Sequence, residues 1–220
     1  MTVRQTGARW ITLATVITLS ALALPGQALG SGDYAAAAPP STPVTVTVQT
    51  VNGSGCPAGT ASVTMLPDNT GFRITYSDFI ARAGGNVPAT DFRKNCQVNL
   101  LVYIPQGFTF AVARADYWGK LRLAAGASAL ERSNYYYQGS SDDNYVDHPI
   151  SGPTAGTWHT VDVTDNAELV YAPCGAVRSL NINTELRVDA GPAAATTSYI
   201  SLRASEGDVY TVVQFQWKQC

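Results

Sequence analysis

The stretch SLNINTELRV, residues 179–188, alternates apolar and polar side chains along its whole length. Its positions divide into an apolar face of Leu180, Ile182, Thr184, Leu186 and Val188 and a polar face of Asn181, Asn183, Glu185 and Arg187. Successive side chains of a β-strand point to opposite sides, so this period of two predicts a strand with one face in a core and the other in water.

Similar alternating runs fill the chain from residue 44 onward. The runs 96–105 and 107–117 flank Pro105–Gly107, and we expect them to form a hairpin. Further runs cover residues 44–51, 61–66, 71–79, 157–165, 198–205 and 210–218. About ten short strands without a helical stripe predict an all-β fold, a jelly-roll-like sandwich of two antiparallel sheets, with a partly open barrel as the alternative.

The first 30 residues have the pattern of a secretory signal peptide. Arg4 and Arg9 precede an uncharged apolar run at 10–24, and small residues surround the expected cleavage point at Ala28 or Gly30. The run falls short of the ~20 apolar residues that cross a bilayer, so we expect a secreted protein without a membrane span after cleavage. Residues 31–43, rich in alanine and proline, predict a disordered leader, and residues 44–220 a single domain.

The charge of the exported chain argues against two classes of partner. Without Arg4 and Arg9, 14 − 2 = 12 basic residues remain against 16 acidic ones. A mildly acidic chain without lysine or arginine clusters disfavours nucleic acid and anionic membranes as partners.

All four cysteines, Cys56, Cys96, Cys174 and Cys220, lie in the predicted domain. In an oxidising compartment they predict two disulfides, and three pairings are open. Pairing of sequence neighbours closes the shortest loops, each worth ~4 kcal/mol on the chain-entropy model, but longer loops have similar values and chain entropy leaves the pairing undecided. The spacing does not match a zinc site.

No catalytic or cofactor motif stands out. The sequence lacks a GxSxG nucleophile elbow and an HExxH zinc motif, so we expect no catalytic, cofactor-binding or metal-binding residues. His148 precedes Pro149 in a predicted polar loop, and His159 shares a strand face with Val161 and Val163, which predicts a half-buried structural histidine.

Carboxylates leave one enzymatic alternative open, because a glycan-active enzyme needs only two of them across a groove. The glutamates of the exported chain are Glu131, Glu168, Glu185 and Glu206. Glu185 lies two residues from Arg187 on one strand face, which favours a surface ion pair over catalysis.

Aromatic residues gather between positions 117 and 145. Flat rings suit sugars, because they bury the apolar face of a sugar while its rim still hydrogen-bonds. This favours Trp118, Tyr135, Tyr137 and Tyr145 as a candidate ligand surface. The alternative is that one face of Tyr135–Tyr137 packs into the core, which is the commoner fate of strand tyrosines.

The stretch QGSSDDNYVDHP, residues 138–149, gathers four calcium-type ligands, Asp142, Asp143, Asn144 and Asp147. Their order differs from a calcium-binding loop, and Ser, Asp, Asn and Pro are also ordinary turn residues. We therefore expect a solvated loop linking two strands rather than a weak calcium site.

Five ordered motifs carry a family resemblance. They are NGSGCP (52–57), NCQVNLLVYIPQGFTF (95–110), APCG (172–175), SLNINTELRV (179–188) and WKQC (217–220). Together they resemble the secreted family called domain of unknown function 4360, found in actinobacteria and fungi, over about residues 46–220. The resemblance supports pairing of Cys56 with Cys96 and of Cys174 with Cys220, whereas the family has no established activity to carry over.

The sequence thus predicts a secreted, disulfide-stabilised β-sandwich of unknown biochemical activity. We expect a non-catalytic binding protein or a cell-envelope-associated protein, with a glycan or an envelope surface as partner. The alternative is a glycan-active enzyme that uses a carboxylate pair.

Overall fold

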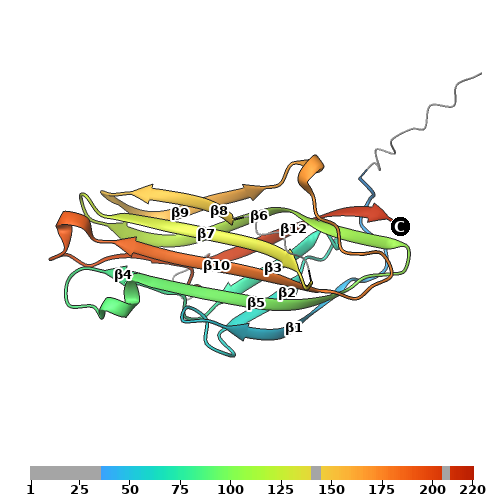
Figure 1. Cartoon of the computed structure of the whole chain (residues 1–220), viewed down its shortest axis with the longest axis horizontal. Coiled ribbons are helices and arrows are strands. Elements are labelled where there is room, and N and C mark those ends of the chain that lie inside the picture. The colour runs from blue at the N-terminus through green and yellow to red at the C-terminus, as the bar shows by residue number, and fades with distance from the viewer. Residues whose placement is uncertain (1–35, 140–144, 205–208) are drawn as a thin grey trace, which may run out of the picture. The chain divides into compact units, whose positions relative to one another are not determined.

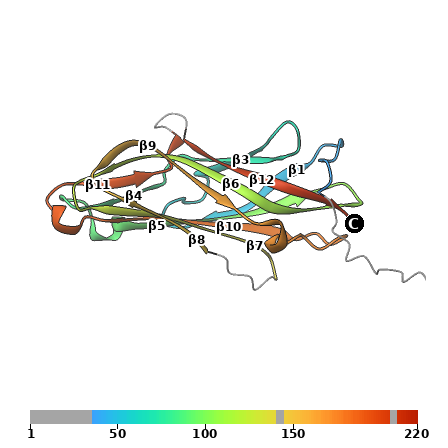
Figure 2. The same ribbon diagram turned by 90° about the horizontal axis from the view of Figure 1, so that it is seen from above.

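The computed structural model describes residues 36–139, 145–204 and 209–220, which form two antiparallel β-sheets packed face to face (Figure 1). The view in Figure 2, turned by 90°, shows the two layers. The expected two-sheet antiparallel sandwich is therefore confirmed. It is jelly-roll-like in that most connections along the chain cross from one sheet to the other. Among the described residues, no helix is long and apolar enough to span a membrane.

The five-stranded sheet has the order β1-β5-β10-β7-β8. Its strands are β1 (Thr45–Asn52), β5 (Arg93–Tyr103), β10 (Ser179–Asp189), β7 (Ser128–Tyr137) and β8 (Tyr145–Ser151). The strand β10 holds the SLNINTELRV stretch and lies at the centre between β5 and β7. Its apolar face is buried as predicted, with Leu180 and Ile182 each 1% exposed and Leu186 fully buried.

The seven-stranded sheet has the order β2-β3-β12-β6-β11-β4, and β9 pairs with β6. Its strands are β2 (Ala61–Met65), β3 (Gly71–Tyr76), β12 (Tyr210–Gln219), β6 (Phe108–Leu123), β11 (Ser198–Ser201), β4 (Ile80–Ala83) and β9 (Thr154–Val163). Three short 3-10 turns, η1 (Ala89–Phe92), η2 (Asn166–Glu168) and η3 (Gly191–Ala193), lie in the connections.

The expected hairpin around Pro105–Gly107 is wrong. The strand β5 pairs with β1 and β10, whereas β6 pairs with β12, β9 and β11, so the two strands lie in different sheets. Both strands are amphipathic, and they bury their apolar faces across the core from each other rather than side by side. Alternation predicts which face of each strand is buried, but not which strand lies beside it.

A β-bulge reverses the alternation within β6. Its register with β12 shifts between Gln214 and Phe215. Phe110 faces the core before the bulge and Tyr117 after it, although they are seven positions apart. The shift turns Trp118 to the outer face of the seven-stranded sheet.

Both disulfides join the neighbours expected from the resemblance. Cys56 pairs with Cys96, and Cys174 pairs with Cys220. Cys56 and Cys96 are buried in the core, whereas the second bridge fixes the C-terminal residue beside the connection that follows η2.

Residues 36–43, expected as part of a disordered leader, lie against the domain. Ala37 donates its backbone N–H to Trp217 at 2.9 Å, and the Asn69 amide donates to the carbonyls of Pro40 and Thr42 at 2.9 and 3.0 Å. Composition alone does not reveal a distant side chain such as Asn69, which bonds the carbonyls of the predicted leader.

Candidate functional site

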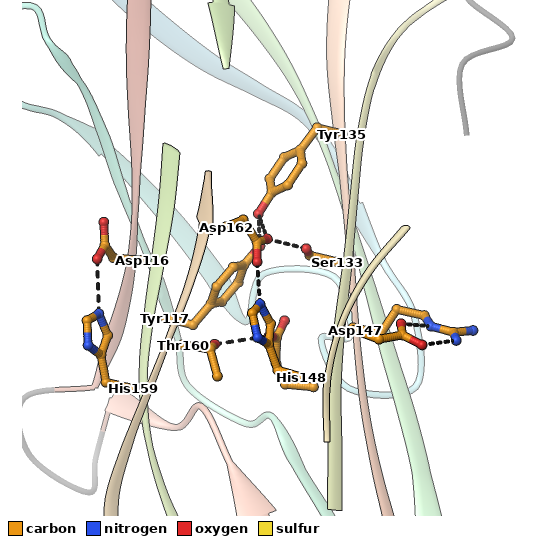
Figure 3. A network of polar contacts seen from close by, with 11 residues as sticks. Asp116, Tyr117, Ser133, Tyr135, Asp147, His148, His159, Thr160 and Asp162 are labelled. Atoms are coloured by element: carbon orange, nitrogen blue, oxygen red, sulfur yellow. Dashed lines mark hydrogen bonds and ion pairs between the residues drawn. The ribbon is translucent and has the colours of Figure 1, made fainter. Parts of the chain in front are cut away.

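A network of polar side chains lies between the two sheets (Figure 3). It lies where β8 and β9 run along the same side of the sandwich (Figure 1). The strand β8 is the edge of the five-stranded sheet, and among the described strands β9 pairs only with β6. Side chains that point inward from these strands therefore meet across the edge of the core.

The strand β9 contributes Asp162 because its inward face carries Trp158, Thr160 and Asp162. Trp158 is 6% exposed and Asp162 is 4% exposed. His159 shares the opposite, outward face with Val161 and Val163, and its side chain is 42% exposed, so the half-buried position expected for it lies on the outside of the sheet rather than in the core. The large indole of Trp158 is buried in preference to the smaller valines, and that choice reverses the whole strand.

Two strands of the other sheet supply the remaining groups. Glu131 and Ser133 point inward from β7 and are fully buried, and His148 points inward from β8 opposite Glu131. The predicted polar loop at His148 is therefore wrong, because residues 145–151 form a paired strand. Pro149 is compatible with that strand because β8 is an edge, where a missing N–H breaks no ladder.

Asp162 is the centre of the network. Its Oδ1 lies 2.6 Å from Nε2 of His148, and its Oδ2 accepts hydrogen bonds from the hydroxyls of Ser133 and Tyr135, the latter at 2.7 Å (Figure 3). The hydroxyl of Tyr135 is also 2.5 Å from that of Tyr117. Burial raises the pKa of both tyrosines, so both hydroxyls stay neutral, and that of Tyr135 donates to the carboxylate.

Glu131 is the residue of the network whose hydrogen bonds are incomplete. Its Oε2 accepts a hydrogen bond from Thr160 at 3.1 Å, whereas its buried Oε1 has no partner in the described structure. Burial, with a smaller effect from the charge of Asp162, raises the pKa of Glu131 well above its usual value. A carboxyl group in this position is stable only when protonated or neutralised by a cation.

The second histidine belongs to a different cluster, on the outer face of the seven-stranded sheet. Nε2 of His159 lies 3.0 Å from Asp116, whose other oxygen accepts from Arg114 at 2.5 Å. Although burial opposes the effect, the hydrogen bonds and charges of Arg114 and His159 lower the pKa of Asp116. The His159 ring stacks on Trp118 with centroids 4.5 Å apart and planes 9° apart.

The outer face of the five-stranded sheet carries rows of polar side chains. One row crosses four strands, from Gln97 on β5 through Asn183 on β10 and Asn134 on β7 to Tyr145 on β8. Next to it lies a row of charges, in which Glu185 pairs with Arg93 and Arg187, and Asp147 pairs with Arg132 at 2.5 Å. The expected pairing of Glu185 with Arg187 is thus present, with Arg93 added.

Some residues of these two rows line a groove of about 240 Å³. The outward-facing groups along it are Arg93, Asn95, Gln97, Arg132, Tyr145, Asn183 and Glu185. Tyr145 is 58% exposed, and its ring lies over the guanidinium of Arg132 at 5.5 Å. The Asn183 amide, in contrast to the paired charges, has no hydrogen-bond partner among the described residues.

The four candidate ligand-binding aromatics do not form one surface. Trp118 lies on the outer face of the seven-stranded sheet and Tyr145 on the outer face of the other sheet. Tyr135 and Tyr137 point inward, where Tyr137 is 5% exposed and donates its hydroxyl to the Phe110 carbonyl at 2.9 Å. Tyr137 therefore packs into the core, as the alternative interpretation predicted. Of the four aromatic residues, Tyr145 alone borders the groove.

Three of the four calcium-type ligands, Asp142, Asp143 and Asn144, lie outside the described residues. The fourth, Asp147, accepts hydrogen bonds from Nε and Nη2 of Arg132, each at 2.5 Å. The hydrogen bond from Arg132 is the main reason that the pKa of Asp147 is lowered. The stretch 138–149 thus ends in a strand, and its last carboxylate is already paired.

Sequence reasoning missed the Glu131, His148 and Asp162 cluster, because its members lie on three strands with no shared motif. One signal was available in the run TWHTVDV, residues 157–163. Trp158 and Asp162 lie on the same face of a strand, so a strand that buries Trp158 also buries Asp162. A second was Glu131, which shares a strand face with Ala129 and Tyr137 and is buried with them.

Comparison with known proteins gives a family. The model of the family described as domain of unknown function 4360 matches residues 42–220. The chain belongs to that family. An uncharacterised secreted protein of Arthroderma benhamiae is 31% identical over 171 residues, which cover 78% of this chain and 69% of the relative. This relative and the paired cysteines confirm the expected location, and the chain is a secreted member of the family.

Solved structures give only remote matches. TmCBM61 in complex with β-1,4-galactotriose has a TM-score of 0.29 at 10% identity, with 81% of this chain and 90% of that chain covered. The enzymatically active domain of tailspike protein 4 of bacteriophage CBA120 has a TM-score of 0.26 at 14% identity, with 80% and 19% covered. TM-scores this low carry no inference about the function of this chain.

Proposed function

We propose that this secreted family member is a non-catalytic glycan-binding protein whose ligand lies in the groove on the outer face of the five-stranded sheet. One observation carries the proposal: amide, guanidinium and tyrosine side chains from four adjacent strands converge on that groove. A glycan of a cell envelope is a partner of the same chemistry.

The chemistry of these groups fits sugar hydroxyls. A hydroxyl both donates and accepts hydrogen bonds, and the amides of Gln97 and Asn183 do the same from adjacent positions of one row. The guanidinium of Arg132 is already fixed by Asp147, so binding loses little of its conformational entropy. The exposed ring of Tyr145 adds an apolar surface at the rim.

Trp118 is a weaker candidate in spite of its size. Its ring lies between His159 on one side and Tyr210 on the other, with the Tyr210 centroid 4.8 Å away. The guanidinium of Arg73 covers Tyr210 in turn, at 4.1 Å from its centroid. The His159 ring therefore already covers one of the flat faces that a sugar ring would need, and the Tyr210 ring is tilted beside the indole.

Retention of the purified secreted domain on a panel of immobilised polysaccharides, after a glycan-array screen, tests the proposal. We expect Asn183→Ala and Tyr145→Ala to weaken binding about 5- to 10-fold each, since each removes a contact worth ~1 kcal/mol. Trp118→Ala is the matched control, because it truncates an aromatic side chain on the other sheet. Loss of retention in Trp118→Ala with no change in the two groove variants would contradict the proposal.

The alternative function is a glycan-active enzyme that uses a carboxylate pair, and Glu131 with Asp162 is the pair that favours it. Ligand oxygens of the two residues lie within 4.8 Å of each other, close to the spacing of a retaining glycosidase. Both side chains are buried between the sheets, so a substrate would reach them only if the β8 and β9 edges separated. Release of reducing sugar that Glu131→Gln abolishes would favour this alternative.

A further inference from the structure

We propose that Glu131, His148 and Asp162 form a site for one divalent transition-metal ion, best matched by Zn²⁺, that joins the edges of the two sheets. Each residue offers one ligand atom, and these atoms all lie within 4.8 Å of one another. The three come from β7, β8 and β9, so a bound ion would link β9 of one sheet to β7 and β8 of the other.

The ligand types fit this class of ion. Zn²⁺ binds imidazole nitrogen and carboxylate oxygen at about 2.0–2.2 Å, and three protein ligands with water at the fourth position is a common set. Hard ions such as Ca²⁺ prefer six or more oxygen ligands, which this cluster does not offer. An ion between Nε2 of His148 and Oδ1 of Asp162, now 2.6 Å apart, would separate them to ~3.3 Å in tetrahedral geometry.

The charge of the cluster supports a divalent cation. Two carboxyl groups are buried together, and His148 can supply at most one positive charge. The other groups that contact them, the hydroxyls of Ser133, Tyr135 and Thr160, are neutral. The nearest guanidinium in sequence, Arg132, follows Glu131 on the same strand, so it points to the opposite face of the sheet, where it pairs with Asp147. A divalent ion would balance both carboxylates at once.

The hydrogen bonds leave one oxygen of each carboxyl group for an ion. Ser133 and Tyr135 hold Oδ2 of Asp162, and Thr160 holds Oε2 of Glu131. Oε1 of Glu131 has no partner, although the residue is fully buried. Donors that orient a carboxylate while its second oxygen binds the metal are the usual outer shell of such sites. His148 is 23% exposed and gives the ion access from the surface.

A second contact between a histidine and an aspartate serves as an internal control for the proposed site. His159 also contacts an aspartate, Asp116, but the third group there is the cation Arg114 rather than a carboxylate. Arg114 already neutralises Asp116, so that pair has no need of a metal ion. A variant at His159 therefore removes an equivalent histidine without touching the proposed site.

The test is calorimetric titration of chelator-treated protein with Zn²⁺, with melting temperature as a second readout. We expect one ion per chain, proton release on binding and a rise in melting temperature, since an ion bound only by the folded state stabilises it. Glu131→Gln and His148→Gln should abolish this stoichiometric binding, and His159→Gln should retain it. Visible absorption of bound Co²⁺ reports the same site without relying on stability.

Three results would overturn the proposal. They are a wild-type protein that binds no Zn²⁺ or Co²⁺, unchanged stoichiometric binding in His148→Gln, and loss of binding in His159→Gln alone. If Glu131→Gln fails to fold, the wild-type stoichiometry and the pair of histidine variants still decide the outcome.

Discussion

Nε2 of His148 on β8 lies 2.6 Å from Oδ1 of Asp162 on β9, and this contact ties the edge strand of one sheet to an edge strand of the other. At this edge two buried carboxyl groups, of Glu131 and Asp162, lie beside the partly exposed His148. Buried charges of this kind stabilise a fold only when their partners are complete. We therefore expect the ionisation of Glu131, whose hydrogen bonds are incomplete, to make the stability of this edge depend on pH.

Glu131→Gln should remove a pH-dependent loss of stability from the metal-free protein. The raised pKa of Glu131 means that the folded state keeps its proton after the unfolded chain, with a pKa near ~4.3, has released it. The folded state then binds more protons, so its stability falls as pH rises, by ~1.4 kcal/mol for each unit between the two pKa values. Glutamine resembles the neutral carboxyl group and does not titrate.

Urea unfolding of both proteins in chelator between pH 4 and pH 8 measures this effect. The stability of Glu131→Gln relative to wild type should increase with pH across this range. Parallel profiles for the two proteins would show that the folded pKa of Glu131 is close to its unfolded value.

Tyr137→Ala should behave as a core substitution. The ring is buried against Phe110, with centroids 5.7 Å apart, and its loss should cost about 3–5 kcal/mol in urea unfolding. Tyr137→Phe keeps the ring and loses the hydrogen bond to the Phe110 carbonyl, which should cost ~1 kcal/mol. The exposed Tyr145→Ala is the control and should stay within about 0.5 kcal/mol of wild type. Weakened glycan retention in Tyr137→Phe at unchanged stability would assign Tyr137 to the ligand surface instead.

Asn69 should be the residue that holds the leader. It has a φ of 58°, and its amide bonds three backbone groups, the carbonyls of Pro40 and Thr42 and the N–H of Val44. Asn69→Ala loses these bonds and also strains the backbone, so we expect a cost of about 2–4 kcal/mol. Asn69→Gly loses the same bonds but tolerates the positive φ, and it should cost less.

Melting temperature and protease cleavage within residues 36–43 distinguish these two effects. Both variants should be cleaved there faster than wild type, because both free the leader. Wild-type cleavage rates in Asn69→Gly would show that the amide bonds do not hold the leader in place.

The sequence predicts the faces of individual strands better than their partners. Alternation identifies Leu180 and Ile182 as core residues because a strand of either sheet must bury its apolar side. The partner of a strand depends on long-range packing, and the adjacent β5 and β6 lie in different sheets for this reason. The candidate sites depend on those partners, since Gln97 and Asn183 become neighbours only when β5 pairs with β10.

Two local features follow from the same limit. The face of His159 carries two valines, yet the core face of that strand is the one that carries the larger Trp158. Proline and polar residues around His148 indicated a loop, yet an edge strand tolerates both. The buried cluster of Glu131, His148 and Asp162 could be found only once these two strands were placed correctly.

Chemical-shift perturbation in the ¹⁵N-labelled domain tests the proposed glycan site most directly. A glycan from the retention screen should shift the side-chain amides of Gln97 and Asn183 and the backbone amides of Arg132 and Tyr145 along one saturable curve. The indole N–H of Trp118 should not move. Shifts centred on Trp118, His159 and Tyr210, with the groove residues unchanged, would contradict the assignment of the binding face.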